Sequence, residues 1–212
     1  MTQIIVADDH PMVQAALRAA LTTALPDIEI IACHTLEGVS QAVAVNPTGI
    51  DLILLDLGMP GVQGFSGLFL LLAEYPTIPV AIISAQESPM TIRRSVAYGA
   101  SGFLPKSLGL PDLAKAISNI LAGDIWVPPN FRSDAPMTDE DNDMARRFAT
   151  LSSQQVRILM MIVEGKLNKQ IASALNVAEQ TVKVHVSTIF RKLGVRSRTQ
   201  AAVLLQRVQT VS

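Results

Sequence analysis

The run Asp51–Pro60 (Asp-Leu-Ile-Leu-Leu-Asp-Leu-Gly-Met-Pro) constrains the fold of this chain more than any other segment. Its four consecutive apolar residues, 52–55, predict a strand buried on both faces, as in the middle of a parallel sheet. The strand ends at Asp56, and glycine and proline then turn the chain. Open α/β sheets carry their chemistry at the carboxyl ends of such strands, so Asp56 is a candidate site residue unless it merely caps a loop.

Strand-like and helix-like segments alternate through residues 1–123. The expected strands are 3–7, 28–33, the central run, 79–84 and 101–104, and the expected helices are 11–25, 36–45, 66–74, 88–98 and 110–122. Strands separated by helices of this length predict an α/β fold, a doubly wound sheet of five parallel strands. The carboxyl ends of all its strands share one edge.

Charged and polar side chains follow the expected strands at this edge. Asp8 and Asp9 end the first strand, Asp56 the central one and Ser84 the fourth, and Lys106 comes soon after the fifth. Crowded carboxylates repel each other, and a hard cation such as Mg²⁺ relieves that repulsion with oxygen ligands. A lysine and a hydroxyl beside the metal can bind phosphoryl oxygens, so the set suits phosphoryl transfer to a carboxylate.

Each of these residues also has a purely structural interpretation. Asp8 and Asp9 could cap a helix, Ser84 could be a loop donor and Lys106 a surface charge. Their joint occurrence at the strand ends favours a site. His10 adjoins the two aspartates, but Mg²⁺ disfavours imidazole, so we expect no metal role for it.

These motifs resemble the receiver domain of bacterial two-component response regulators over about residues 1–123. The resemblance rests on Asp8-Asp9, on Asp56 within Asp-Leu-Gly-Met-Pro-Gly, on Ser84-Ala85, and on Lys106 after Gly-Ala-Ser-Gly-Phe-Leu-Pro. It implies a sheet with strand order 2-1-3-4-5 and a phosphoacceptor at Asp56.

The receiver resemblance further implies a Mg²⁺ site around the phosphoacceptor. Asp9, Asp56 and the carbonyl group of Gly58 would hold the ion directly, whereas Asp8 would act through water.

The same resemblance assigns three residues to the phosphoryl group and its signal. Ser84 and Lys106 would bind the phosphoryl oxygens, and Phe103 occupies the position of the family's switch aromatic. An aromatic residue in a short strand is often plain core, so packing is the alternative for Phe103.

Composition indicates a globular protein that stays in the cytoplasm. The chain has 212 residues, of which 49% are hydrophobic, and its one cysteine, Cys33, excludes an internal disulfide. The N-terminus lacks the basic region of a secretory signal, and no apolar run approaches the roughly 18 residues of a membrane span. We therefore expect no membrane contact.

Charge is distributed unevenly along the chain, although the formal net charge is only −1. Residues 1–123 carry 5 Lys or Arg against 10 Asp or Glu, residues 124–150 carry 3 against 6, and residues 151–212 carry 9 against 2. A basic terminal segment on an acidic protein suggests a nucleic-acid-binding module, although a basic face is often only a solvated one.

Residues 124–150 have the composition of a linker. Residues 126–129 (Trp-Val-Pro-Pro) favour an extended chain, and 139–143 are acidic with almost no apolar neighbours. We therefore predict a receiver domain over 1–123, a linker over 124–150 and a DNA-binding domain over 151–212. A further hypothesis is that the acidic linker competes with DNA for the basic domain; unchanged DNA affinity after deletion of 139–143 would contradict it.

The last 62 residues follow a purely helical pattern. Expected helices are 153–164, 168–175, 179–193 and 197–209, and the second and third are joined by the tight turn Asn-Val-Ala. Ser152 with Gln155 and Ser197 with Gln200 have capping-box spacing. The pattern predicts an all-α helix-turn-helix domain.

The expected helix 179–193 has an apolar back and a basic front. A helix of this kind fits the major groove of DNA, although a solvated amphipathic helix is the alternative. Four segments of the sequence resemble the LuxR-type helix-turn-helix. They are Leu-Ser-Ser-Gln-Gln from Leu151, Asn-Lys-Gln-Ile-Ala from Asn168, Thr-Val-Lys-Val-His from Thr181 and Lys-Leu-Gly-Val from Lys192. Receiver and helix-turn-helix together resemble the NarL/FixJ class of response regulators.

The LuxR-type resemblance implies DNA contacts from two helices and pairing through a third. DNA contacts would come from Asn168, Lys169, Thr181, Lys183, Val184, Ser187, Arg191 and Lys192, with base edges read by Lys183, Val184 and Ser187. The last helix would pair two domains through Ala201, Leu204, Leu205 and Val208.

Four positions depart from the family pattern. Gln154 and Gln155 stand where Arg-Glu is usual, and Arg157 stands where Glu is common, which removes a family ion pair but keeps the capping geometry. Ala178 replaces a capping Ser before the third helix, a loss of about 1 kcal/mol of helix stability.

We therefore expect a transcriptional regulator rather than an enzyme. A sensor histidine kinase would phosphorylate Asp56 with Mg²⁺, and the chain would dimerise on activation and bind double-stranded promoter DNA. One alternative is a DNA-binding regulator whose receiver is a phosphorylation-independent dimerisation scaffold. Another is a Mg²⁺-dependent phosphotransferase that uses Asp56 as its nucleophile.

Overall fold

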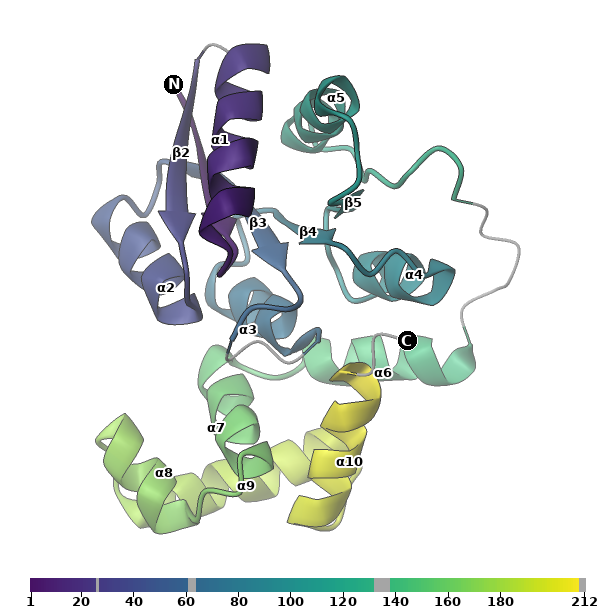
Figure 1. The fold of residues 1–212 in the computed structure, drawn as a ribbon. Helices are drawn as coiled ribbons and strands as arrows, with labels where there is room; N and C mark the ends of the chain where they lie inside the picture. Colours follow the sequence, from purple (N-terminus) through teal and green to yellow (C-terminus); the bar gives the residue numbers. More distant parts are fainter. Residues whose placement is uncertain (26, 61–63, 132–137, 210–212) are drawn as a thin grey trace.

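The computed structural model describes residues 1–25, 27–60, 64–131 and 138–209 (Figure 1). Its five parallel strands are β1 (Thr2–Ala7), β2 (Ile28–Cys33), β3 (Ile50–Asp56), β4 (Val80–Ser84) and β5 (Gly102–Pro105). They form one sheet in the order β2-β1-β3-β4-β5. The predicted doubly wound sheet and its strand order are confirmed.

Helices cover both faces of this sheet (Figure 1). They are α1 (Pro11–Ala24), α2 (Leu36–Val45), α3 (Ser66–Glu74), α4 (Pro89–Ala97) and α5 (Leu110–Leu121). Alternate strand residues point to opposite sides. Leu52 and Leu54 therefore join the cluster under α1 and α5, whereas Ile53 and Leu55 join the one under α2, α3 and α4. The central strand is buried on both faces, as predicted.

Helix α6 (Asp139–Ala149) lies inside the segment whose composition suggested a linker. The composition of this segment had predicted a linker without a helix. Thr138 caps it by accepting a hydrogen bond from the Asp141 amide (3.1 Å), and the acidic first turn suits the positive end of the helix dipole. Met144 and Phe148, one turn apart, are its buried apolar residues. The helical spacing of these two apolar residues indicates an amphipathic helix. The acidic composition of the segment had instead suggested a solvated linker.

Four further helices make up the terminal part of the described chain. They are α7 (Ser153–Val163), α8 (Asn168–Leu175), α9 (Glu179–Leu193) and α10 (Arg198–Gln209), so the predicted all-α arrangement is confirmed. Ser152 and Gln155 form the expected capping box on α7. Ala178 occupies the N-cap of α9 and makes no side-chain capping bond, as its methyl group requires.

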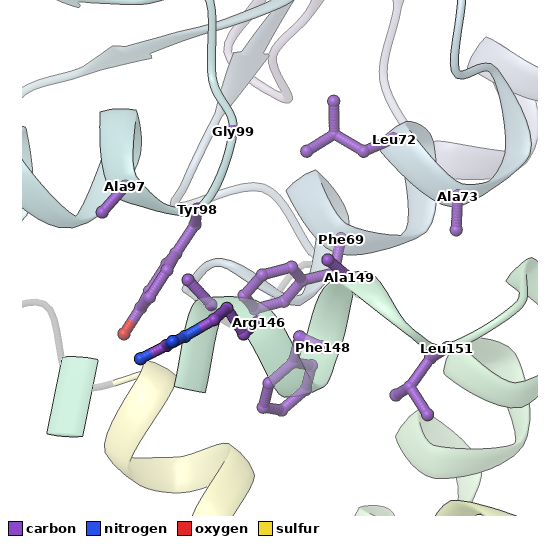
Figure 2. Close-up of a pocket in the computed structure, with 11 residues that line it drawn as sticks. Phe69, Leu72, Ala73, Ala97, Tyr98, Gly99, Arg146, Phe148, Ala149 and Leu151 are labelled. Atoms are coloured by element: carbon purple, nitrogen blue, oxygen red, sulfur yellow. The ribbon is translucent and has the colours of Figure 1, made fainter. Parts of the chain in front are cut away.

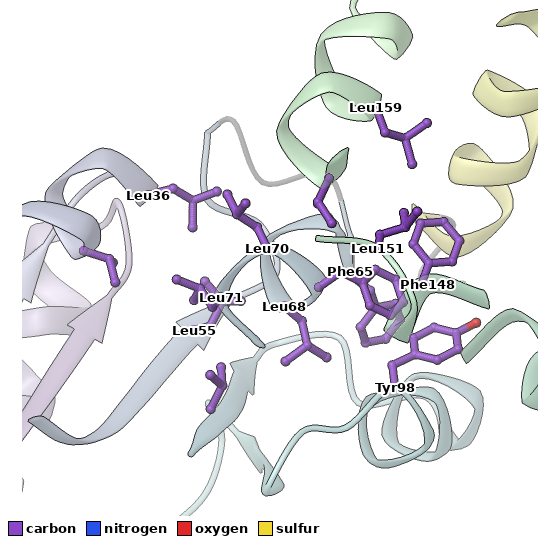
Figure 3. Close-up of a cluster of buried hydrophobic side chains, with 14 of the residues drawn as sticks. Leu36, Leu55, Phe65, Leu68, Leu70, Leu71, Tyr98, Phe148, Leu151 and Leu159 are labelled. Atoms are coloured by element: carbon purple, nitrogen blue, oxygen red, sulfur yellow. The ribbon is translucent and has the colours of Figure 1, made fainter. Parts of the chain in front are cut away.

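One hydrophobic cluster continues from the sheet into the helical part (Figure 3). It runs from Leu36 and Leu55 in the sheet region to Leu159 in α7. Phe69 of α3 stacks on Phe148 of α6, with ring centroids 4.4 Å apart. The two halves of the chain therefore share buried apolar surface. Among the described helices, none combines the length and apolar character needed to cross a membrane.

Candidate functional site

The predicted carboxylates converge at the carboxyl edge of the sheet. Asp8 and Asp9 directly follow β1, and Asp56 is the last residue of the neighbouring strand β3. Asp8 is fully buried and Asp56 is 4% exposed, whereas Asp9 is partly exposed. Two buried carboxylates this close repel each other unless a cation compensates their charge.

Lys106 supplies positive charge between the two buried carboxylates. Its Nζ lies 2.7 Å from Asp8 Oδ2 and 3.0 Å from Asp56 Oδ2. The backbone holds it there because the Lys106 amide donates to the carbonyl group of Ser84 (2.8 Å), beyond the paired ends of β4 and β5. Burial favours neutral lysine, but the two carboxylates outweigh this and raise the pKa of Lys106 above its ordinary value.

Ser84 and Phe103 occupy the adjacent strands β4 and β5. Ser84 is buried at the same edge, and its Oγ accepts a hydrogen bond from the Gln86 amide (3.1 Å). Phe103 is fully buried and belongs to the hydrophobic cluster on the α2–α4 side of the sheet. This burial agrees with the alternative interpretation of Phe103 as a packing residue of the core.

Gln14 of α1 and His10, the residue that precedes this helix, contact the acidic cluster. Gln14, which the sequence analysis did not select, is buried, and its Nε2 donates to the carbonyl groups of Asp8 (2.6 Å) and Cys33 (2.9 Å). His10 Nδ1 lies 2.8 Å from Asp9 Oδ1 and 3.2 Å from Asp8 Oδ1. Gln14 could have been found from its place one turn into the helix that begins at the strand end.

The cluster is suited to a divalent cation. Ligand atoms of Asp8, Asp9, His10 and Asp56 all lie within 4.8 Å of one another. In the described part of the chain, the buried oxygens Asp8 Oδ2 and Asp9 Oδ1 accept no hydrogen bond of good geometry, although Lys106 and His10 lie close. A side chain at Gly58 would begin 3.4 Å from Asp56 Oδ2, at ordinary contact distance, so Gly58 directly borders the carboxylate. Oxygen ligands with spare lone pairs are those that Mg²⁺ prefers.

A second candidate surface is the outer face of α9. The side chains predicted to meet DNA there are exposed: Thr181, Lys183, Val184, Ser187 and Arg191. Lys183 forms an ion pair with Glu179 one turn earlier (3.1 Å), which solvent weakens. Val182, Ile189 and Leu193 are buried on the opposite side of the helix. The amphipathic division expected from the sequence is present.

The remaining predicted DNA contacts are partly engaged within the domain. Lys169 is exposed, but Asn168 Oδ1 accepts a hydrogen bond from Arg198 (2.7 Å). Lys192 Nζ donates to the carbonyl group of Thr150 (2.6 Å) and to Gln155 Oε1 (2.8 Å). Gln155 stands where the family usually has a charged glutamate. Its neutral amide oxygen still accepts a hydrogen bond from Lys192, near the end of α9.

Two of the four residues predicted to pair two chains through α10 are buried within their own domain. Ala201 is fully buried and Leu205 is 2% exposed, because both face the core of their own domain. Neither side chain is available to a second chain. Leu204 is only partly buried, Val203 is exposed, and the side chain of Val208 lies outside the described residues.

Comparison with known proteins identifies the two domains that carry these candidate surfaces. Residues 4–118 match the model of the response regulator receiver domain, and residues 149–205 match that of bacterial regulatory proteins of the luxR family. The chain belongs to the response regulators that join these two domains. Within them it is of the NarL class, since relatives of that class match nearly its full length.

Individual relatives and structures show the extent of this similarity. A glycerol metabolism activator of Pseudomonas putida is 39% identical over 95% of this chain and 93% of its own. The nitrate/nitrite response regulator NarL of Escherichia coli is 31% identical over 94% and 93%. A LuxR family DNA-binding response regulator from Silicibacter pomeroyi (TM-score 0.52, 31% identity) covers 61% of this chain and 98% of its own. Promoter-bound RcsB from Salmonella enterica (TM-score 0.55, 20% identity, 98% of both chains) shows the same fold.

Proposed function

We propose that Asp56 accepts a phosphoryl group from a sensor histidine kinase and that its phosphorylation controls promoter binding. The observation that carries the proposal is the bridging of the buried carboxylates Asp8 and Asp56 by Lys106. A carboxylate oxygen of Asp56 forms the new bond to phosphorus while the donor's P–N bond breaks. Lys106 and Ser84 then lie on the side where the phosphoryl oxygens arrive, and Phe103 is the candidate switch residue behind them.

Mg²⁺ is the cofactor that this site would use. Asp9, Asp56 and the Gly58 carbonyl would hold it, with Asp8 acting through water. When bound, the ion supplies positive charge to the carboxylates and the incoming phosphoryl group. Asp8 and Lys106 keep the acceptor oriented, and burial of Asp56 limits competing water.

The DNA-binding function would reside in α8 and α9, and its partner is double-stranded promoter DNA. Lys183, Val184 and Ser187 stand on the exposed face of α9, where they can meet base edges. Lys169 and Arg191 are exposed cations suited to phosphates, while Thr181, Asn168 and Lys192 contribute from the rim of the same surface. Two chains would pair when activated, as a two-fold DNA site requires.

The boundaries that fit this function are a receiver over 1–123, a connecting segment over 124–150 and a DNA-binding domain over 151–212. The connecting segment contains α6, so it is partly rigid. We place the protein in the cytoplasm, where its kinase and DNA are both accessible, and regard it as a regulator rather than an enzyme.

A phosphorylation assay tests the proposed acceptor. The purified chain is incubated with a small-molecule phosphodonor and Mg²⁺, and intact mass reports the added phosphoryl group. We expect modification of the wild type and none of Asp56→Asn, with Asp51→Asn, an exposed aspartate on the same strand, as the matched control. Wild-type incorporation in Asp56→Asn would refute the site, and steady phosphodonor turnover without a stable adduct would favour the phosphotransferase alternative.

A further inference from the structure

A groove remains where the receiver meets the helix that leads to the DNA-binding domain (Figure 2). It lies between α3, α4 and α6, and its volume is about 400 Å³. Domain interiors contain few voids larger than a water molecule, so the two sides of this contact do not fill each other. Sites for small molecules have volumes of roughly 300–1,000 Å³ and often lie between domains. We call this space the interdomain groove.

Small side chains leave the space open. Five of the residues that line the groove have no side-chain atom beyond Cβ: Ala73, Ala97, Gly99, Ala145 and Ala149. Ala145 and Ala149 lie one turn apart on α6, and Ala73 lies on α3. A larger apolar side chain at one of these alanines would occupy part of the volume. The groove can therefore be blocked without a change of charge.

Aromatic side chains are concentrated in the lining of the interdomain groove. The chain has one Trp, two Tyr and six Phe, and three of these residues line the groove: Phe69, Tyr98 and Phe148. The ring centroid of Phe69 lies 5.2 Å from that of Tyr98 and 4.4 Å from that of Phe148. All three side chains are almost fully buried, so packing already holds them in place. A further aromatic ring can extend this series by edge or offset contacts.

A cation stands at the mouth of the groove. Arg146 is exposed, and it is the one charged residue among the described residues that line the groove. Its Nε donates to the carbonyl group of Asn142 (3.3 Å), and Figure 2 shows its side chain extending toward the hydroxyl end of Tyr98. A guanidinium group can bind a planar carboxylate through two parallel hydrogen bonds.

The acidic residues of α6 do not exclude an anion from the groove. Two of them act on Tyr98, and both are paired within the chain. Asp141 pairs with Arg94 (3.0 Å). Glu140 pairs with Arg207 (2.7 Å). A carboxylate whose charge is balanced by a nearby cation repels an incoming anion less than a free carboxylate does.

We propose that the interdomain groove is a binding site for a small aromatic carboxylate. The ring of the ligand packs among the three aromatic side chains, and its carboxylate pairs with Arg146. A phosphate group is a poorer match, because it carries nearly two charges and the lining offers one guanidinium. The site is separate from the acidic cluster and does not depend on phosphorylation of Asp56.

The test measures the affinity of the full unphosphorylated chain for three small probes by saturation-transfer nuclear magnetic resonance. Phenylacetate has both the ring and the charge, phenylacetamide has the ring alone, and hexanoate has the charge alone. We expect phenylacetate to bind about five times more tightly than phenylacetamide, as for an ion pair near the surface. We expect a similar advantage of about fivefold over hexanoate, because hexanoate makes no aromatic contact.

Three variants locate the binding. Arg146→Gln should weaken phenylacetate binding to the level of phenylacetamide and leave phenylacetamide binding unchanged. Arg196→Gln removes the same charge from an exposed arginine outside the groove, so it is the matched control and should change neither. Ala145→Leu should weaken binding of all three probes, because the added atoms fill the space that the ligand needs.

Several results would overturn the proposal. The first is the absence of saturable phenylacetate binding up to about 10 mM, where a ligand of this size with ordinary efficiency binds. Equal affinity for phenylacetate and either comparison probe would remove the role of the charge or of the ring. Unchanged binding in Arg146→Gln or in Ala145→Leu would place the probe elsewhere. If Ala145→Leu fails to fold by circular dichroism, Ala149→Leu, at an exposed position of the same lining, replaces it.

Discussion

The acidic cluster and the contact between the two domains, which we call the interdomain clamp, both contain charged pairs. The clamp consists of the pairs Arg157–Glu74 and Arg94–Asp141 and the stack of Phe148 on Phe69. The two regions differ in burial and in sequence separation. Lys106 bridges carboxylates that are almost completely removed from water, whereas Arg157 and Glu74 remain partly exposed. Residues of the acidic cluster lie at fixed positions after strands, which a sequence pattern can identify. Residues of the interdomain clamp meet across 47 and 83 sequence positions, and no local pattern marks them. The acidic cluster is thus specified locally, and the contact between the domains is not.

This comparison has an energetic consequence. Breaking a buried pair leaves an uncompensated charge in the interior, whereas a partly exposed pair is replaced by water at small cost. The acidic cluster should therefore be rigid without its ligand, and the Arg157–Glu74 pair should be easy to break.

The largest effect on stability is expected from Phe148→Ala. Phe148 is almost fully buried against Phe69, so truncation should lower the free energy of unfolding by about 3–5 kcal/mol, as for other buried phenylalanines. Urea denaturation measures it, with Leu110→Ala, an exposed apolar residue, as control. A loss below 1 kcal/mol would mean that the two halves are not packed together in solution, and the comparison above would fail.

Lys106→Met should have the next largest effect. The substitution leaves Asp8 and Asp56 buried without their cation, at a cost of about 3 kcal/mol, near the lower limit for breaking a buried pair. Adding Mg²⁺ should restore part of this loss, because the ion compensates the same carboxylates. Chemical denaturation with and without Mg²⁺ is the measurement, and equal stability of both proteins in the absence of Mg²⁺ would contradict the account.

Ala178→Ser sharpens the comparison by stabilising the DNA-binding domain alone. Ala178 already has the extended backbone of an N-cap (φ −67°, ψ 144°), so a serine hydroxyl there can accept from the first turn of α9. We expect a gain of about 1 kcal/mol in thermal or urea unfolding. Ala178→Gly, which adds no hydroxyl, is the control, and an equal gain from glycine would argue against capping.

The smallest effect is a change in the ionisation of Tyr98, which lines the groove between the domains. Burial, opposed by Arg94 and reinforced by Asp141, raises the pKa of Tyr98 to about 12. Because the ordinary value is about 10, neutral Tyr98 contributes to stability fully below about pH 10, and the contribution is lost as the pH rises through the raised pKa.

Ultraviolet titration of the two tyrosines measures this shift, with Tyr98→Phe identifying the signal of Tyr75. Arg157→Glu should lower the pKa of Tyr98 toward 10, since an open interdomain clamp exposes the ring. Because Arg157 also acts on Tyr75, the Tyr75 signal is subtracted in each protein. A Tyr98 signal that is identical in wild type and Arg157→Glu would mean that the groove does not open when the ion pair is lost.

Much of the fold followed from the sequence for a physical reason. Buried parallel strands such as 52–55 are continuous apolar runs, and Asp56, Ser84 and Lys106 lie at strand ends that one edge must bring together. Helix α6 was missed because Asp139, Glu140 and Asp141 suggested a solvated linker, although acidic residues also favour a helix N-terminus.

The partners of Arg157 and the burial of Ala201 could not be predicted either. Arg157 was noticed only as a departure from the family, because its partner Glu74 belongs to another domain. Ala201 and Leu205 have the spacing of an apolar helix face. Spacing alone does not distinguish a face that packs against its own domain, as this one does, from a face that contacts a second chain. Such assignments depend on the docking of whole helices.

The most direct test of the account is DNA binding to the protein's own upstream region, with and without beryllofluoride and Mg²⁺. Wild type is compared with Asp56→Asn in the same titration. The account predicts tighter binding only for wild type with both additions, which would establish the phosphorylation switch and its acceptor together. Equal binding in every condition would contradict it, and would leave a DNA-binding protein whose acidic cluster serves another purpose.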